Sequence, residues 1–388
     1  MSVTSARGFR ASGVTAGLKA SGRPDVAVVV NDGPLQAAAG VFTSNRFAAA
    51  PVLWSRQVLL DGEIHAVVLN SGGANACTGP GGFADTHRTA EHAAGALAKQ
   101  GRDVGAGEIA VCSTGLIGER LPMDLLLAGV DSAVVCLAAT GGGDAAIAIM
   151  TTDTVPKTAA VSTGGFTVGG MAKGAGMLAP GLATMLVVLT TDAVADPAAL
   201  GSALRESARR TFDRIDSDGC MSTNDTVLLL ASGASGITPN HRELTDAVMS
   251  VCDDLARQLI HDAEGASKDI RIDVVNAATE EDAVDAARAV SRSNLLKCAI
   301  HGEDPNWGRV LAALGTTAAD FEPDSVDVAM NGVWVCRSGG VGDDRSLVDM
   351  SAREVFLTID LHAGEASATV WTNDLTAAYV HENSAYST

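Results

Sequence analysis

Short apolar runs rich in β-branched residues recur along the chain, separated by longer segments with helical spacing. Uninterrupted apolar runs of this length are typical of strands that are covered on both faces. The predicted strands are 26–30, 66–70, 108–112, 184–191, 226–232, 270–275 and 355–361. Several of these strands are therefore expected to lie in the interior of the protein.

The segments between the apolar runs predict helices. Residues 84–100 are rich in good helix formers, and 243–264 carries its apolar residues on one face. Asp196 precedes a proline and supplies an N-cap for a helix over 197–211, and a threonine caps another over 279–299. Interleaved strands and helices predict a mixed α/β protein, built as a layered sandwich.

Composition and charge narrow the class of protein. The 388 residues exceed the ~100–200 usual for one domain, and 47% of them are hydrophobic, which is enough for a large core. The net charge of −19 argues against a nucleic acid or an anionic membrane as the partner. The chain has no apolar leader and no long uncharged apolar stretch, so we expect a soluble cytoplasmic protein.

Cysteine and histidine patterns indicate neither a disulfide framework nor a metal site. The seven cysteines are an odd number, lie far apart and show no CxxC spacing, which fits a reducing compartment. His87 and His92 are five positions apart on a predicted helix and so point about 140° away from each other. His301 has no second ligand at a familiar spacing. We expect no metal and no cofactor.

A glycine-rich turn at 174–179, "GAGMLA", matches the G-x-G-x-x-A form of a dinucleotide-binding loop. In that motif a helix opens at the loop, whereas here Pro180 and Gly181 follow and a predicted strand comes next. A nucleotide-binding module is therefore a disfavoured alternative. The patterns GxxxxGK[ST], HExxH and GxSxG do not occur.

Thr184 stands where this glycine-, alanine- and proline-rich stretch gives way to a strand. A threonine that simply opens a strand is one interpretation, because threonine favours strands. The other is an amino-terminal nucleophile. Cleavage after Ala183 would free an α-amine with a pKa of about 7.7–8.0, which can accept the proton of the same residue's hydroxyl. Spacing alone leaves both interpretations open.

A family resemblance favours the second interpretation. The segment "MAKGAGMLAPGLATML" (171–186) resembles the self-cleavage segment of the ornithine acetyltransferases, which are the glutamate N-acetyltransferases of the cyclic arginine pathway. Further stretches match in the family's order and span nearly the whole chain. They are "NSGGANACTG" (70–79), "CSTGLIG" (112–118), "MTTDTVPK" (150–157), "STNDTVLLL" (222–230), "DAEGASK" (262–268), "DPNWGR" (304–309) and "ENSAYST" (382–388).

The resemblance implies a precursor that cleaves itself between Ala183 and Thr184. It implies an α chain of residues 1–183 and a β chain of residues 184–388, which together form one catalytic unit. The implied fold is a layered α/β sandwich similar to that of amino-terminal-nucleophile hydrolases. The implied assembly is a dimer of cleaved pairs, an α2β2 heterotetramer.

The resemblance also implies the reaction. An acetyl group passes from N2-acetylornithine to L-glutamate through an acetyl ester on Thr184, by a ping-pong route that needs no cofactor. Some members of the family also acetylate glutamate from acetyl-CoA, and the sequence does not decide between the two groups. An aminopeptidase or amidase of similar architecture, which passes its acyl group to water, is the main alternative.

The family's motifs assign site residues in this chain. Thr114 and Gly115 in the "STG" turn correspond to the oxyanion hole. The resemblance suggests Lys173 for the substrate carboxylate and Glu264, at the end of a predicted helix, for the ornithine δ-ammonium. The C-terminus is expected to fold back into the site. The implied substrate-binding residues are Thr151, Lys173, Thr184, Glu264, Asn383 and Thr388.

Overall fold

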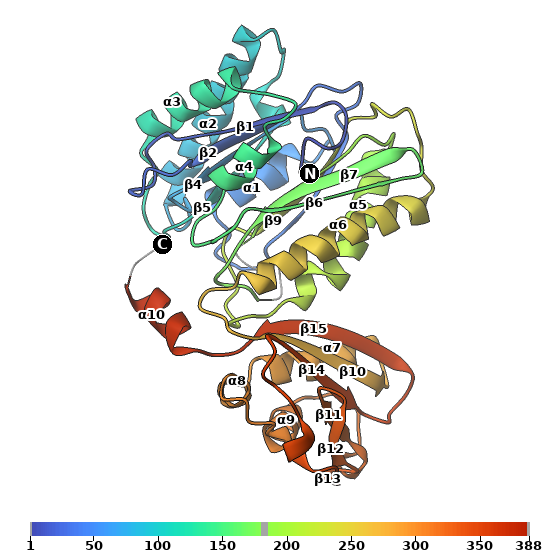
Figure 1. Cartoon of the computed structure of the whole chain (residues 1–388). Helices are drawn as coiled ribbons and strands as arrows, with labels where there is room; N and C mark the ends of the chain where they lie inside the picture. The colour runs from blue at the N-terminus through green and yellow to red at the C-terminus, as the bar shows by residue number, and fades with distance from the viewer. Residues whose placement is uncertain (1, 180–184, 386–388) are drawn as a thin grey trace.

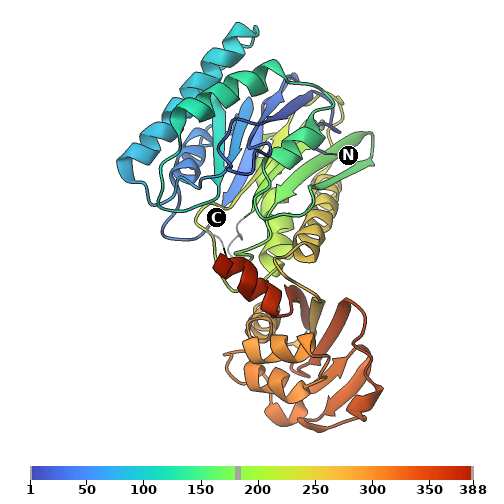
Figure 2. The ribbon, with the colours of Figure 1, turned by 60° about the vertical axis from the view of Figure 1, so that its left-hand side comes forward.

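The computed structural model describes residues 2–179 and 185–385, and it forms two bodies (Figures 1 and 2). The larger body, residues 2–268, is called the sandwich below. The smaller body, residues 269–373, is the C-terminal lobe. A last helix, α10 (Ala377–Ala385), follows the lobe and lies where the two bodies meet, as Figure 2 shows.

The sandwich contains two sheets. The first has four strands in the order β1-β2-β4-β5, in which β4 and β5 are parallel and the other neighbours antiparallel. The second has five strands in the order β3-β9-β8-β7-β6, in which β8 and β9 are parallel. Their bounds are β1 Phe9–Val14, β2 Val26–Asn31, β3 Ala38–Phe42, β4 Ala66–Ser71, β5 Ile109–Thr114, β6 Lys157–Thr163, β7 Phe166–Lys173, β8 Leu186–Thr191 and β9 Thr226–Ala231.

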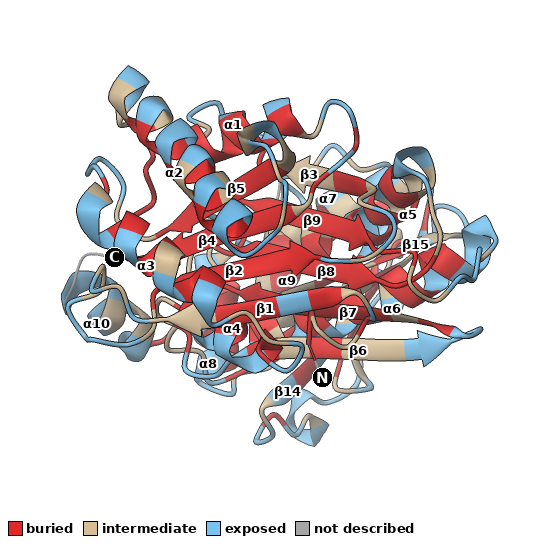
Figure 3. Ribbon diagram, turned by 90° about the horizontal axis from the view of Figure 1, so that it is seen from above, coloured by how far each residue is buried: buried red, intermediate tan, exposed pale blue. Residues whose placement is uncertain are grey.

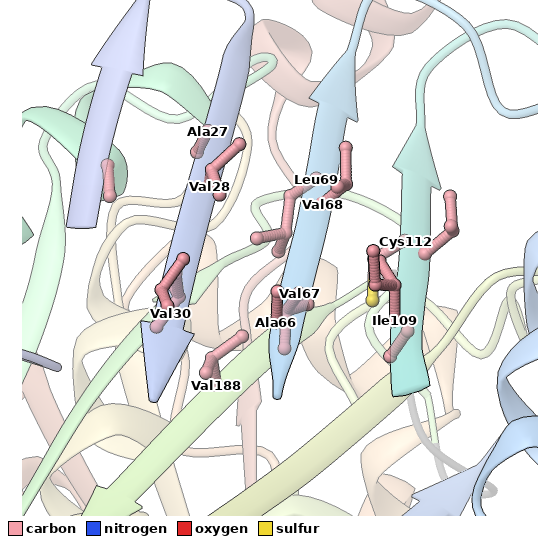
Figure 4. Close-up of a cluster of buried hydrophobic side chains, with 14 of the residues drawn as sticks. Ala27, Val28, Val30, Ala66, Val67, Val68, Leu69, Ile109, Cys112 and Val188 are labelled. Carbon is pink, nitrogen blue, oxygen red and sulfur yellow. The ribbon is translucent and has the colours of Figure 1, made fainter. Parts of the chain in front are cut away.

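Alternation along β8 explains how the sheets stack. Leu186 and Val188 belong to the apolar cluster shared with the first sheet, as the position of Val188 in Figure 4 shows. Val187 and Leu189 belong to the cluster on the opposite side of the strand. Since successive side chains of a strand point to opposite faces, β8 is buried on both sides. Figure 3 shows the central strands as buried throughout.

Helices cover the two outer faces of the sandwich (Figure 1), which gives the layer order helix, sheet, sheet, helix. The first sheet carries α1 (Ala50–Val58), α2 (Gly79–Lys99) and α3 (Met123–Val135). The second sheet carries α5 (Pro197–Arg210) and α6 (His241–His261). A shorter helix, α4 (Gly142–Ala148), packs against β1, β2 and β7.

The C-terminal lobe is a six-stranded sheet with helices packed on it, around a separate apolar core. Its strands, in sheet order, are β13 Gly340–Val341, β12 Val333–Arg337, β11 Asp327–Met330, β14 Glu354–Asp360, β10 Asp269–Ala277 and β15 Ala366–Asn373. Its helices are α7 Glu280–Ser291, α8 Asn294–His301 and α9 Trp307–Leu314. Short 3-10 turns are Ala106–Glu108, Phe212–Arg214, Pro323–Ser325 and Arg345–Leu347.

The predicted mixed α/β class and layered sandwich are confirmed. Asp196 caps α5, and its carboxylate accepts the Ala199 N–H at 2.7 Å. The single helix predicted over 279–299 is wrong, because the chain breaks after α7 and Ser293 caps a new helix, α8. All seven cysteines are free. Within the described ranges, no helix is long and apolar enough to cross a membrane.

Candidate active site

Two neighbouring strands bring the chain up to, and away from, residues 180–184. β7 ends at Lys173 and β8 begins at Leu186, and these two residues face each other in the antiparallel register. The connection between β7 and β8 therefore starts and finishes at the same end of these two neighbouring strands. The predicted cleavage residues Ala183 and Thr184, and the predicted substrate contact Thr388, lie outside the described residues.

Thr114 and Gly115, the predicted oxyanion hole, lie at the end of β5 in the first sheet, where Thr114 is the last residue of the strand. The Thr114 carbonyl accepts the N–H groups of Gly72 and Gly73, each at 3.0 Å. Gly115 has a φ of 129°, and a Cβ there would lie 2.6 Å from the Gly73 nitrogen, so only glycine fits. Among the described residues, the Gly115 N–H has no hydrogen-bond partner. Within that part of the chain, it is an available donor at the predicted oxyanion hole.

Lys173 joins the oxyanion-hole turn to the end of β7. Its side chain is buried, and Nζ lies 3.3 Å from Oγ1 of Thr114, to which it donates. Burial lowers the pKa of Lys173 because the charged form loses its hydration, while the nearby Asp153 carboxylate opposes that shift. The two residues come from segments almost sixty positions apart, so the fold brings together two groups that the family motifs assigned separately.

Asp153 is a residue that the motif analysis missed, and it connects several parts of the site. One carboxylate oxygen accepts the Thr151 N–H at 2.9 Å. The other accepts the Gly174 N–H and the Lys157 ammonium, both at 2.7 Å. Burial raises the pKa of Asp153, but the Lys173 and Lys157 charges outweigh it and hold the pKa at about 2. Asp153 thus ties the predicted substrate contact Thr151 to the end of β7.

Asp225 holds the other side of the connection. Its Oδ1 accepts the Met185 N–H at 3.1 Å, immediately before β8, and the Met185 carbonyl accepts the Thr226 N–H at 3.1 Å. The side chain is fully buried. Burial raises the pKa of Asp225 well above its ordinary value, although the Met185 N–H and the hydroxyls of Ser222 and Thr43 oppose it. No sequence signal distinguished this aspartate from others.

Glu264 and Asn383, two of the predicted substrate contacts, come together from distant parts of the chain. The Asn383 Nδ2 donates to the Glu264 carboxylate at 2.9 Å, so α10 returns to the site. The helix predicted to end at Glu264 ends earlier, at His261, because the chain turns out of α6 after Asp262. Glu264 is therefore not in the helix's last turn, and its N–H donates to the Ala175 carbonyl at 3.0 Å.

A cavity of about 370 Å³ adjoins Glu264 between the sandwich and the C-terminal lobe. Charged and polar groups line it, among them Asp218, Lys297, Asp374 and Tyr379. Burial lowers the pKa of Lys297 to about 8, although nearby aspartates oppose the shift. The described part of the chain contains no group of three or more histidines, cysteines and acids placed to hold a metal ion.

The glycine-rich turn does not have the form of a dinucleotide-binding loop. Residues 174–179 follow β7, and no helix begins within them. The backbone of this turn is bent, with a φ of 155° at Gly174 and 53° at Met177. On α2, His87 Nε2 lies 3.5 Å from the Glu91 carboxylate, and His92 Nε2 lies 3.0 Å from the Asp131 carboxylate of α3. His301 Nδ1 lies 2.9 Å from the Asp374 carboxylate. None of these features indicates a nucleotide.

Comparison with known proteins places the chain in a family. The ArgJ family model matches residues 10–388. The arginine biosynthesis bifunctional protein ArgJ of Streptomyces coelicolor is 69% identical over 387 residues, with 100% of both chains covered. The ArgJ protein of Mycobacterium leprae is 58% identical, with 99% of this chain and 95% of the relative covered.

Among solved structures, ornithine acetyltransferase from Mycobacterium tuberculosis, complexed with ornithine, is 61% identical. The match covers 48% of this chain and 96% of that chain, with a TM-score of 0.46. The extent of the family match and the identity to full-length relatives together decide the assignment. The chain belongs to the ArgJ family.

Proposed function

We propose that this protein is a glutamate N-acetyltransferase of arginine biosynthesis, which moves an acetyl group from N2-acetylornithine to L-glutamate. One observation carries the proposal in a chain of the ArgJ family. Thr114, Lys173 and Glu264, which the family motifs assigned separately, all lie close to the connection between β7 and β8. The relatives' part in arginine biosynthesis, and ornithine in the M. tuberculosis protein, support the choice of substrate.

The first step in this proposal is self-cleavage between Ala183 and Thr184. The hydroxyl of Thr184 attacks the preceding carbonyl, and hydrolysis of the resulting ester leaves an α chain of residues 1–183 and a β chain of residues 184–388. The two chains would remain associated, because β7 and β8 pair within one sheet. We further propose an α2β2 assembly and a cytoplasmic location.

The second step is acetyl transfer. The free α-amine of Thr184 takes the proton of its own hydroxyl, and Oγ attacks the acetyl carbonyl of N2-acetylornithine. The carbon–nitrogen bond breaks, the proton passes to the departing amine, and ornithine leaves behind an acetyl ester. The amine of glutamate then attacks the ester, N-acetylglutamate forms, and the threonine hydroxyl is restored.

Each tetrahedral intermediate places negative charge on the former carbonyl oxygen. The donors proposed for that oxygen are the hydroxyl of Thr114 and the N–H of Gly115, which has no partner within residues 2–179 and 185–385. A donor of this kind is worth about 2.7–4 kcal/mol in the transition state. Lys173 lies against Thr114 and adds positive charge beside the same position.

Glu264 is the proposed partner of the ornithine δ-ammonium. Its carboxylate is held by Asn383 and borders the cavity between the two bodies. A Glu264→Gln variant keeps the hydrogen-bonding shape but removes the charge, so the KM for acetylornithine should rise while self-cleavage continues. An unchanged KM would refute this role. Removal of residues 383–388 should abolish transfer and leave cleavage largely intact.

The central experiment is the intact mass of the purified protein beside a Thr184→Ala variant. The proposal predicts two fragments, ending at Ala183 and beginning at Thr184, for the wild type and one full-length chain for the variant. The variant should also lack transferase activity. A fully active wild-type protein that is not cleaved, or a fully active Thr184→Ala protein, would refute the proposal.

Two finer questions concern the acyl donor and acceptor. An aminopeptidase or amidase would release its acyl group to water, so free acetate and N-acetylglutamate should be measured in the same reaction. The proposal predicts N-acetylglutamate in excess when glutamate is present. Activity with acetyl-CoA and glutamate, in the absence of acetylornithine, would add the second acetyltransferase activity that some members of the family have.

A further inference from the structure

The segment that leads to the proposed cleavage site, residues 174–179, is fixed by contacts although its composition is that of a flexible loop. Its first N–H, at Gly174, donates to Asp153 at 2.7 Å. Its Ala175 carbonyl accepts the Glu264 N–H at 3.0 Å, and its Leu178 carbonyl accepts the Ser217 N–H at 2.5 Å. These partners come from three separate parts of the sequence, so tertiary structure holds the segment.

Met177 is the strained point of this segment. Its φ of 53° lies in the left-handed region, which disfavours residues with a Cβ. The Met177 N–H donates to Oδ2 of Asp218 at 2.7 Å. The other oxygen of Asp218 accepts the Cys220 N–H at 3.0 Å, so a local turn fixes the carboxylate. The hydrogen bond to Asp218 thus offsets the backbone strain at Met177.

The bend brings the segment close to a proposed substrate residue. A Cβ added at Gly176 would lie 2.6 Å from the Glu264 carboxylate, so the backbone passes directly against that side chain. Leu178 is fully buried and packs with Ala263. The path of the chain from Gly174 to Ala179 is therefore determined on both sides, before the chain reaches residue 180.

We propose that Asp218 is a positioning residue for self-cleavage, which acts by holding Met177 in its left-handed conformation. This inference rests on the proposed function. An intramolecular attack is fast when few conformations must be lost before the reacting atoms meet. Asp218 fixes the direction in which the chain enters the connection to β8, while Asp225 fixes the point at which it leaves. In this role Asp218 acts through the Met177 backbone.

The test follows the rate of cleavage in precursor made by cell-free synthesis, by denaturing gel after synthesis is stopped. Asp218→Ala removes the acceptor for the Met177 N–H and should slow cleavage roughly tenfold or more. Asp218→Asn keeps an acceptor oxygen and should restore cleavage to within about threefold of wild type. An Asn variant as slow as the Ala variant would overturn the proposal.

Two substitutions at Met177 test the same step with Asp218 intact, in case Asp218→Ala does not fold. Met177→Gly accepts a positive φ without strain and should cleave at close to the wild-type rate. Met177→Ile is β-branched, resists the left-handed region, and should slow cleavage roughly tenfold. Wild-type rates for both Met177→Ile and a folded Asp218→Ala would overturn the proposal.

Asp196→Ala is the matched control, because Asp196 also accepts a backbone N–H at 2.7 Å but caps α5, away from this segment. It should lower the melting temperature and leave the cleavage rate unchanged. If the control cleaves as slowly as Asp218→Ala, the slower cleavage reflects a general loss of stability and the proposal is overturned. Thr184→Ala, run in parallel, separates the two hypotheses, since its cleavage would refute the proposed function whatever Asp218 does.

Discussion

Two ion pairs of nearly equal length, one in each body, differ in how far their side chains are exposed to water. In the sandwich, Lys157 and Asp153 lie 2.7 Å apart, and both side chains are fully buried. In the C-terminal lobe, Arg337 and Asp327 lie 2.8 Å apart, with half of the arginine side chain exposed. The N···O distances alone would suggest that the two pairs stabilise the fold equally, but their exposure to water differs.

The difference lies in the cost of removing charge from water. A buried pair loses most of its hydration, and its mutual attraction repays this only with good geometry and further hydrogen bonds. Asp153 has those bonds, to Thr151 and Gly174. In the Arg337–Asp327 pair the arginine stays half exposed and keeps more of its water, so this pair is expected to contribute less. The Lys157–Asp153 pair is therefore expected to depend far more on its surrounding hydrogen bonds than the Arg337–Asp327 pair does.

Removal of the Asp153 charge should have the largest effect. Asp153→Asn leaves the ammonium groups of Lys157 and Lys173 buried with less compensation, so the free energy of unfolding should fall by about 3–5 kcal/mol. Asp327→Asn in the C-terminal lobe is the matched control and should cost less, because it leaves a half-exposed arginine, and no fully buried ammonium group, without its full partner. Urea denaturation in a Thr184→Ala background measures both from a single chain. Equal losses of unfolding free energy in the two variants would show that burial does not distinguish the two ion pairs.

The next largest effect is expected at Thr114. Thr114→Val removes a proposed oxyanion donor at nearly constant volume, so kcat should fall by about 100- to 1,000-fold, with little change in KM. The matched control is Thr369→Val, since the Thr369 hydroxyl also forms a hydrogen bond with an ionisable side chain, that of Asp273, but lies in the C-terminal lobe. Steady-state kinetics decide the outcome. A normal kcat for Thr114→Val would remove this residue from the mechanism.

Acid titration should sharpen the comparison further. The pKa of Asp153 is lowered in the folded protein from its ordinary 3.8 to about 2. Its stabilising contribution is therefore present above about pH 4 and is lost as the pH falls toward 2. The stability difference between wild type and Asp153→Asn should narrow over that range, as followed by urea denaturation at each pH. A difference that stays constant from pH 5 to 2 would contradict the assigned shift.

The smallest effect is expected at Arg337, which is half exposed. Arg337→Ala removes the ion pair with Asp327 and a cation–π contact with Trp334, whose ring centroid lies 4.1 Å from the guanidinium carbon. Because the arginine is half exposed, the loss should be about 1 kcal/mol or less, visible as a small drop in melting temperature. A loss of stability comparable to that of Asp153→Asn would show that exposure to water does not explain the difference between the two ion pairs.

Much of the fold could be predicted from local patterns. Each predicted apolar run is found as a strand, because strands covered on both faces need continuous apolar residues. The Asp196 cap was also recognisable, since capping is a local interaction. The remaining strands were not predicted, because their sequences mix apolar residues with polar residues or glycine; they are β1, β3, β6, β7, β11, β12, β13 and β15. The break at Ser293 was missed because helical spacing continues across it.

The residues of the candidate site were likewise only partly predictable from the sequence. Family motifs located Thr114, Lys173, Glu264 and Asn383, and the fold brings Thr114 to Lys173 and Asn383 to Glu264. The motifs gave no role to the three aspartates that hold the connection between β7 and β8, which are Asp153, Asp218 and Asp225. Many other aspartates share their local patterns, and only their burial and their backbone partners distinguish them.

The sequence by itself determined the class of fold, the buried strands and the family motifs, because these depend on residue type and spacing over short distances. Only the tertiary structure decided which carboxylates hold the backbone on either side of residues 180–184. It also decided that a methionine takes a left-handed conformation there. The physical reason is that hydrogen bonding and burial between distant segments arise from packing, and no local pattern encodes them.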